Sequence, residues 1–140
     1  MNTEAMLKGD VLHDITHWGL RASIGTIFIV HSLKKFEPSW QEWLISIGIP
    51  PEMQLPIALA EFIGGILLIV GVLTRVTGSI FAVILLGAIF LIKWENGFFV
   101  SKGGWEWDLV MLAVVLAIIV AWPGRISISH IVKKIPRFLQ

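Results

Sequence analysis

One carboxylate lies inside a long apolar stretch of the chain. Glu61 falls within the run from Leu59 to Leu73, whose other residues are all apolar or Gly. An ionised carboxylate in a membrane helix costs roughly 2.5–3.5 kcal/mol on insertion scales, so it is expected to face protein or water and to have a partner. Glu61 is therefore the first candidate for proton transfer, a task that suitably placed carboxylates perform.

Cationic and aromatic residues that could meet Glu61 lie near the ends of the other apolar segments. At about 1.5 Å of rise per helical residue, Glu61 lies roughly 10 Å below one membrane surface, and these residues lie near the same surface. A pocket there would combine a carboxylate, cations and tryptophan rings, which suits a quinone head group or a small anion. The candidate catalytic residues are Glu61, His31 and Lys35, and the candidate cofactor-binding residues are Lys34, Lys93, Trp105 and Glu106.

The same residues also permit a purely structural interpretation. A pair of Glu61 with a Lys or His inside the membrane would fix the register of two helices without any chemistry, and the sequence leaves both interpretations open. His31 alone is more typical of a satisfied core or interface histidine than of a catalytic one. Glu106 and Asp108 are expected to be ordinary acidic residues at a helix start, where the helix dipole favours negative charge.

Several classes of site are excluded or not expected. The chain has no Cys, which excludes disulfides, thiolate metal sites and cysteine-ligated iron–sulfur clusters. His17 and His31 lie fourteen residues apart on one predicted helix, but no other predicted span contains a histidine, so haem is not expected. No acidic residues cluster with a further ligand, so no metal is expected either. The net charge of +1 gives no case for nucleic-acid binding.

The elements that must position these residues are membrane helices. The chain has 140 residues, of which 56% are hydrophobic and 15% charged, and its mean hydropathy is +0.81. Soluble proteins carry about 25% charged residues. We therefore predict one integral membrane domain, residues 1–140, with an all-α fold: an antiparallel four-helix transmembrane bundle. The predicted spans are about 16–33, 54–73, 76–94 and 107–122.

Two of the predicted spans have a recognisable inward face. In the first, Arg21, Ile24, Phe28, His31 and Lys35 recur at steps of three and four, which places them on one stripe. In the second, the face of Glu61 also carries glycines, and small residues let another helix approach closely. We expect the stripe to face the bundle, but the helix phase does not decide between Lys34 and Lys35.

The first loop and the charge distribution predict how the bundle sits in the membrane. Ser39 could cap a short interfacial helix that runs to Ile47, with Trp40 and Trp43 at the depth of the lipid head groups. A small excess of cations on the side of the termini predicts that both termini are cytoplasmic, in the plasma membrane of a prokaryote. The cations on that side are Lys8, Arg75, Arg125, Lys133, Lys134 and Arg137, against Lys34, Lys35, Lys93 and Lys102 on the other.

A series of short motifs carries a family resemblance from Arg21 to about Ser129. In chain order they are Arg21 with Gly25 and Phe28; His31-Ser32-Leu33-Lys34-Lys35; Gly48 with Pro50; Glu61-Phe62-Ile63-Gly64-Gly65; Gly71-Val72-Leu73-Thr74-Arg75; Gly103-Gly104-Trp105-Glu106; and Pro123-Gly124-Arg125-Ile126-Ser127. In this order the chain resembles the DoxX-like family of small four-span membrane proteins, which includes the DoxD-type subunit of thiosulfate:quinone oxidoreductase. It departs from the family in having Ser129 where members often have an acidic residue. It is also shorter than a typical DoxD subunit and lacks a long periplasmic region.

The resemblance implies a four-helix bundle with oxidoreductase or quinone-linked roles. We therefore expect a membrane subunit of a quinone-linked oxidoreductase, with thiosulfate or another small reductant as substrate and quinone as the cofactor. Glu61 would exchange protons with the quinone, while His31 and Lys35 stabilise the reduced oxygen or bind an anion. The alternative is a non-catalytic accessory subunit that stabilises a larger membrane enzyme through its glycine face and its tryptophan-rich outer loop. Expected partners are the lipid bilayer and either other membrane subunits or further copies of the chain; a transporter is less favoured because no inverted repeat is visible.

Overall fold

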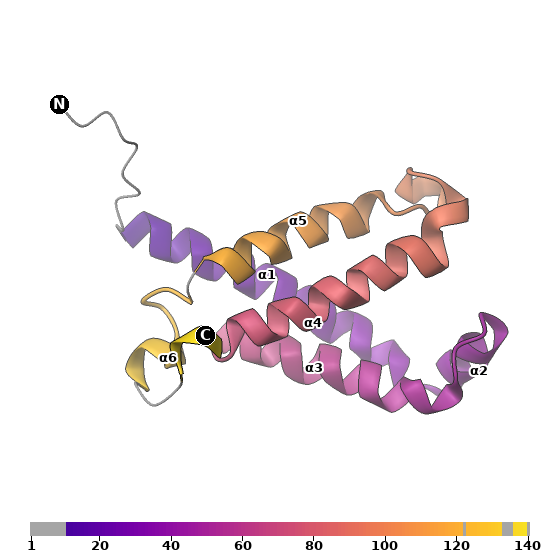
Figure 1. The fold of residues 1–140 in the computed structure, drawn as a ribbon, viewed down its shortest axis with the longest axis horizontal. Helices are drawn as coiled ribbons and strands as arrows, with labels where there is room; N and C mark the ends of the chain where they lie inside the picture. Colours follow the sequence, from indigo (N-terminus) through magenta and orange to yellow (C-terminus); the bar gives the residue numbers. More distant parts are fainter. Residues whose placement is uncertain (1–10, 122, 133–135, 140) are drawn as a thin grey trace.

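The chain folds entirely into helices in the part that the structure describes. A computed structural model describes residues 11–121, 123–132 and 136–139, and these ranges contain no strand (Figure 1). The all-α prediction is confirmed. The elements are α1 (Val11–Lys35), α2 (Pro38–Ser46), the 3₁₀ turn η1 (Pro51–Met53), α3 (Gln54–Val70), α4 (Thr74–Gly87), the π-helix η2 (Ala88–Lys93), the 3₁₀ turns η3 (Trp94–Asn96) and η4 (Val100–Lys102), α5 (Glu106–Val120), α6 (Ile128–Ile131) and the 3₁₀ turn η5 (Arg137–Leu139).

Four long helices alternate in direction along the long axis of the molecule (Figure 1). They form two close pairs, α1 with α3 and α4 with α5. The pairs lie together at the end that holds α6, which we call the closed end. They diverge at the opposite end, which holds α2 and the loop with η3 and η4, and which we call the open end.

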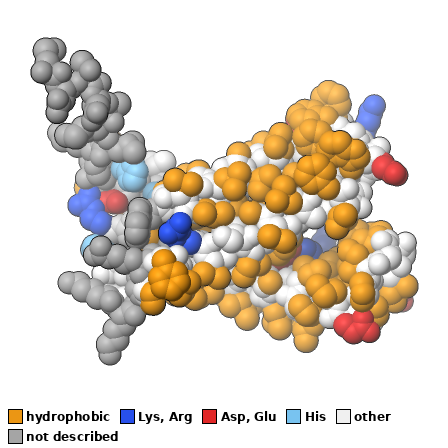
Figure 2. All heavy atoms as spheres, in the orientation of Figure 1, with side chains coloured by type: hydrophobic (Ala, Val, Ile, Leu, Met, Phe, Trp, Pro, Cys, Tyr) orange, Lys and Arg blue, Asp and Glu red, His pale blue; other side chains and the backbone are white. Residues whose placement is uncertain are grey.

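Two helical segments are long and apolar enough to cross a membrane by length and composition. They are Pro51–Val70, with 20 residues and a mean hydropathy of 2.0, and Thr74–Asn96, with 23 residues and a mean hydropathy of 2.3. Only 28% and 33% of the residues in their apolar windows are buried, whereas the core helix of a soluble protein is mostly buried. Apolar side chains cover the middle of the molecule (Figure 2). For α1, which carries several charges, and α5, which has 15 residues, spanning stays a sequence prediction.

Glycines let the helices approach one another closely. A Cβ on Gly25 would lie 2.6 Å from the carbonyl oxygen of Gly65, and a Cβ on Gly65 would lie 2.6 Å from that of Gly25. A Cβ on Gly64 would come within 2.8 Å of the Phe81 ring. The glycines of α3 therefore pack against α1 and α4 of the same chain. The expectation that this face binds a partner subunit is wrong, because helices of the bundle already cover it.

The core of the bundle is apolar and stacks two aromatic rings at its centre. Phe28 of α1 lies on Phe81 of α4 with ring centroids 3.7 Å apart and planes 11° apart. The predicted inward stripe of α1 is confirmed for its first three members, which are buried. The remaining core residues come from all four long helices; they are Ile24, Leu68, Ala82, Leu85, Met111, Val115 and Ile118.

The closed end is held together by a buried arginine. Helix α3 ends at Gly71, which adopts the left-handed conformation (φ 74°) that ends many helices. Arg21 is fully buried and donates hydrogen bonds to the carbonyl oxygens of Leu68, at 3.0 Å, and of Ile126. A carbonyl in the last turn of a helix has no partner within that helix. Arg21 therefore joins α1, the end of α3 and the segment after α5.

A second contact at the closed end lies at the surface. Arg125 donates a hydrogen bond to Asp14 at 2.6 Å. Desolvation raises the pKa of the Asp14 carboxyl, but the hydrogen bond from Arg125 and the positive charge of Arg125 lower it. The net effect is a pKa below the usual value for Asp. Three of the cations used to predict topology, Lys8, Lys133 and Lys134, lie outside the described residues, as does Trp122 at the end of the fourth predicted span.

The open end carries two loops with short helices. The predicted interfacial helix is present as α2, but it begins two residues earlier than expected: Glu37 and not Ser39 precedes its first residue, Pro38, and the described contacts include no side-chain cap. Proline is favoured there because its fixed φ suits the first helical turn. Gly48, with φ 78°, follows the end of α2. In the second loop Trp105 stacks on Trp94, with ring centroids 5.9 Å apart, and meets Phe98 edge-on.

Candidate functional site

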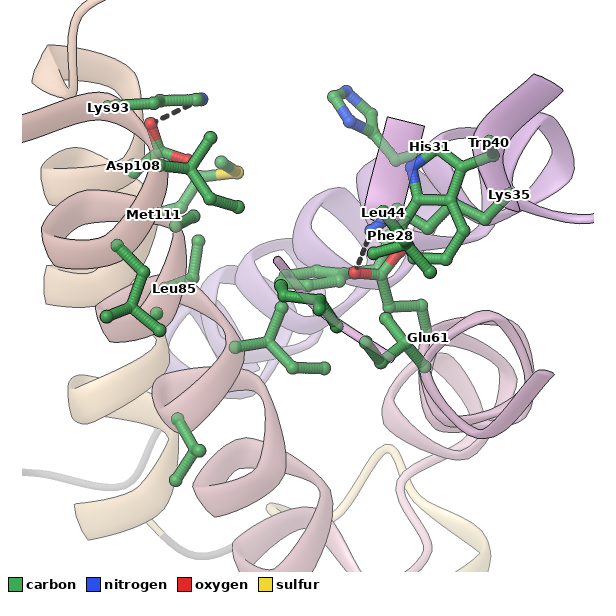
Figure 3. A pocket seen from close by; sticks show the side chains of 18 of the residues that line it. Phe28, His31, Lys35, Trp40, Leu44, Glu61, Leu85, Lys93, Asp108 and Met111 are labelled. Atoms are coloured by element: carbon green, nitrogen blue, oxygen red, sulfur yellow. Dashed lines mark hydrogen bonds and ion pairs between the residues drawn. The ribbon is translucent and has the colours of Figure 1, made fainter. Parts of the chain in front are cut away.

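A cavity of about 580 Å³ lies between the two helix pairs at the open end. Its volume falls within the roughly 300–1,000 Å³ typical of small-molecule pockets. The lining is mostly apolar and includes the rings of Trp40, Trp43 and Trp107. Few polar side chains interrupt this lining, and most of them form two ion pairs. The titratable lining residues are His31, Lys35, Glu61, Lys93 and Asp108 (Figure 3).

The first ion pair joins α1 to α3. Lys35 contacts Oε1 of Glu61, whose side chain is 2% exposed, while that of Lys35 is 18% exposed. The Lys35 ammonium also lies 5.3 Å from the ring centroid of Trp40 on α2, a cation–π contact. Oε2 of Glu61 is buried and has no hydrogen-bond partner among the described residues. Glu61 thus has one buried oxygen without a described partner beside the cavity that it lines.

The second ion pair joins η2 to α5 on the opposite side of the cavity (Figure 3). Lys93 Nζ lies 2.6 Å from Oδ2 of Asp108, and their side chains are 33% and 5% exposed. Lys93 is the last residue of the π-helix that continues α4. Single π-turns inside α-helices are rare and are often found at functional sites.

His31 lies one helical turn before Lys35 on α1 and also lines the cavity. His31 is exposed, so its ring lies at the mouth of the cavity rather than in the core. This position would let it pass protons between the cavity and water.

Three of the predicted site residues lie elsewhere. Lys34 is exposed and does not line the cavity, which answers the question of helix phase in favour of Lys35. Glu106 accepts a hydrogen bond from the Val100 backbone nitrogen at 3.1 Å, and Trp105 belongs to the aromatic stack of the loop. Glu106 and Trp105 thus fix the shape of the second loop rather than line the cavity.

Asp108 is the site residue that the sequence interpretation missed. The sequence pattern predicts an ordinary acidic residue at a helix start, and Asp108 does lie in the first turn of α5. A usable signal was present, however: Asp108, Met111, Val115 and Ile118 recur at steps of three, four and three, and all four are buried. That periodicity places Asp108, and not Glu106, on the inward face of the helix.

A second groove, of about 410 Å³ and almost entirely apolar, adjoins the cavity between α3 and α4. Its only polar side chain among the described residues is Ser79, whose hydroxyl donates to the Arg75 carbonyl at 2.8 Å. Four residues line both the groove and the cavity: Met53, Ile57, Val83 and Ile84. The groove and the cavity therefore adjoin each other at these four apolar residues.

Metal-binding side chains do not cluster in the described part of the chain, where no three His, Asp or Glu residues lie together as ligands. Of the two histidines considered for haem, His17 lies at the closed end, where its ring stacks on that of His13, and His31 lies at the cavity. The expectations of no metal and no haem stay predictions.

Comparison with known proteins identifies the family. The DoxX family model matches residues 18–94, a range that includes Lys35, Glu61 and Lys93 but ends before Asp108. A Bacillus subtilis (strain 168) protein named "Putative oxidoreductase CatD" is 40% identical to this chain over 95 residues, which cover 66% of this chain and 69% of the relative. No solved structure matches. The family match and this relative together show that the chain belongs to the DoxX family of membrane proteins.

Proposed function

We propose that this chain is a membrane subunit of a quinone-linked oxidoreductase and that it binds the quinone ring in the cavity at the open end. The observation that carries the proposal is Glu61, a buried carboxylate that keeps one oxygen without a partner beside an apolar cavity. The name of the Bacillus subtilis relative, an oxidoreductase, supports the general class of reaction.

The lining of the cavity fits a quinone. A quinone has a flat apolar ring, which tryptophan side chains can stack against, and carbonyl oxygens, which accept hydrogen bonds. The ring contacts would come from Trp40, Trp43 and Trp107, and the donors would be the lysines of the ion pairs. The apolar groove between α3 and α4 could hold the hydrocarbon tail of a membrane quinone.

A bound quinone supplies an acceptor for two electrons and two protons. Lys35 would donate a hydrogen bond to a ring oxygen and would stabilise negative charge that develops there. Glu61 would first take up a proton from water through His31, at the mouth of the cavity, and would hold it on Oε2, from which it can pass to that oxygen. The electrons come from a small reductant or from a partner subunit; two thiosulfate ions joined through a new S–S bond as tetrathionate release the two that are needed.

A competing function, that of a non-catalytic accessory subunit, is favoured by one observation. Each ion pair joins two neighbouring helical elements, α1 to α3 and η2 to α5. Buried pairs of this kind can serve helix register alone. In that case loss of Glu61 would reduce the amount of assembled protein and would leave no ligand-binding defect to measure.

Binding and assembly can be separated with the purified protein. Quinones quench tryptophan fluorescence on contact, so a para-benzoquinone with a short alkyl tail is titrated into detergent-solubilised protein. We expect saturable quenching that is weakened about tenfold or more in Glu61→Gln, because the Lys35 ammonium, which Glu61 holds at the cavity wall, would no longer be positioned to donate a hydrogen bond to a ring oxygen. Glu52→Gln, an exposed acid on η1, is the matched control. Unsaturable quenching in the wild type, with normal folding, would refute the proposal.

A turnover assay with the same purified protein tests whether thiosulfate is the source of the electrons. Reconstituted with the para-benzoquinone, the protein is mixed with thiosulfate, and quinol formation is followed by absorbance. Quinol formation that depends on both Glu61 and thiosulfate would support the proposal that this protein oxidises thiosulfate, with the quinone as electron acceptor. Binding without turnover would instead mean that a partner subunit supplies the electrons.

We further propose that both termini are cytoplasmic in a prokaryotic plasma membrane, with the open end on the outer face, as the distribution of cations predicts.

A further inference from the structure

The two ion pairs of the cavity have the same design. In each, the carboxylate is almost fully buried and the lysine is more exposed: 2% against 18% for Glu61 and Lys35, and 5% against 33% for Asp108 and Lys93. The pairs lie on opposite sides of the cavity, one on the α1–α3 pair and the other on the η2–α5 side (Figure 3). All four side chains line the same space.

Each lysine keeps hydrogen-bonding capacity for a ligand. A lysine ammonium has three N–H donors, and the described hydrogen bonds of Lys35 and Lys93 use one donor each, for Glu61 and Asp108. The remaining donors are available at the edge of the cavity.

The space between the two pairs is apolar. Phe28, Leu85 and Met111 line it (Figure 3). A ligand that fills the cavity therefore meets donors at one end, apolar side chains along its middle and donors again at the other end. This pattern suits a flat apolar ring with acceptor oxygens at two opposite positions.

We propose that Lys93 and Asp108 form a second binding pole and that the cavity selects para-quinones, whose oxygens lie on opposite sides of the ring, over ortho-quinones, whose oxygens are adjacent. This inference rests on the proposed quinone binding. One oxygen lies at Lys35 and Glu61 and the other at Lys93 and Asp108. Reduction adds one proton to each oxygen, and the carboxylate of each pole would take up that proton from water and pass it to the oxygen beside it.

The test compares two probes on three proteins. The probes are a para-benzoquinone and an ortho-benzoquinone with the same short tail, and binding is read from tryptophan quenching. The proteins are the wild type, the double variant Lys93→Met/Asp108→Leu and the control Lys102→Gln, which changes an exposed lysine of the neighbouring loop. The double variant removes both charges together, because an apolar replacement of a whole buried pair commonly preserves folding, whereas removal of one partner does not.

The wild type and Lys102→Gln should bind the para-quinone at least roughly tenfold more tightly than the ortho-quinone, because the second pole adds a hydrogen bond from a charged donor. The double variant should bind both probes alike, with the affinity of the wild type for the ortho-quinone. A folded double variant that retains the full para preference would overturn this inference and leave the proposed function intact. Saturable binding of neither probe by the wild type would overturn both.

Discussion

Loss of Lys35 should destabilise the protein more than loss of its ion-pair partner Glu61 does. Lys35→Met leaves the carboxylate of Glu61, a residue that is 1% exposed, without its cation. Removal of one partner from a buried pair costs about 3–5 kcal/mol, because an uncompensated charge stays buried. Glu61→Gln leaves a lysine whose side chain is 18% exposed and still contacts the ring of Trp40. With that contact retained and water within reach, we expect a cost of about 1–2 kcal/mol.

The double variant Lys35→Met/Glu61→Gln removes both charges and should cost about 1–2 kcal/mol, much less than the sum of the single variants. The coupling free energy is then about 3–5 kcal/mol. The assay is reversible unfolding in mixed micelles with increasing SDS, followed by tryptophan fluorescence and circular dichroism. Lys34→Met and Glu52→Gln, which change exposed neighbours, should stay within about 0.5 kcal/mol of the wild type. Equal costs for the two single variants, or an additive double variant, would refute this reasoning.

Four further predictions follow from other parts of the molecule. Gly65→Val should destabilise the protein by about 1–3 kcal/mol in the same assay, because its side chain would collide with the backbone of α1, whereas Gly87→Ala, where a Cβ meets nothing within 4 Å, should be harmless. Ala60→Phe fills the apolar groove and should weaken binding of a long-tailed para-quinone but not of a tailless one; Ala113→Phe, exposed on α5, should affect neither. Because the folded pKa of Asp14 is lowered, its contact with Arg125 should stabilise the protein above the ordinary carboxyl pKa and be lost as the pH falls through the lowered value; Arg125→Ala should abolish this acid-side dependence in unfolding titrations. The chain has no Cys, so an impermeant maleimide applied to intact cells should label Ser101→Cys at the open end and not Ile131→Cys at the closed end, and the reverse pattern would invert the proposed topology.

The sequence was most informative where a residue type conflicts with its surroundings. Glu61 stands out because an acid among apolar residues needs a partner, and the inward stripe of α1 predicts that a partner lies near the end of that helix. The helical class follows from the length and hydropathy of the apolar runs. Each of these inferences depends only on the residue types and spacing within a single segment, which can be read directly from the sequence.

What could not be predicted depends on helix phase and on contacts distant in sequence. Lys34 and Lys35 differ by one position on α1, and only the packed structure decides which of them meets Glu61. Trp105 was expected at the pocket, but it stacks on Trp94, a contact across the second loop that no spacing rule indicates. The glycines of α3 predicted a close helix contact correctly, but nothing in their spacing shows that the contact lies within the chain.

The π-helix η2 places Lys93 at the second pole of the cavity. A π-turn bonds each backbone N–H five residues back instead of four, so one residue more than an α-helix requires lies between the body of α4 and Lys93, and the wider turn absorbs this extra residue. If residues 88–93 continued α4 as a regular α-helix with the same number of residues, Lys93 would be rotated by roughly 100° around the helix axis. It would then leave Asp108 although no pocket side chain had changed. Within the family, changes that straighten this segment without removing a residue are therefore expected to alter ligand selectivity more than many substitutions of the lining residues.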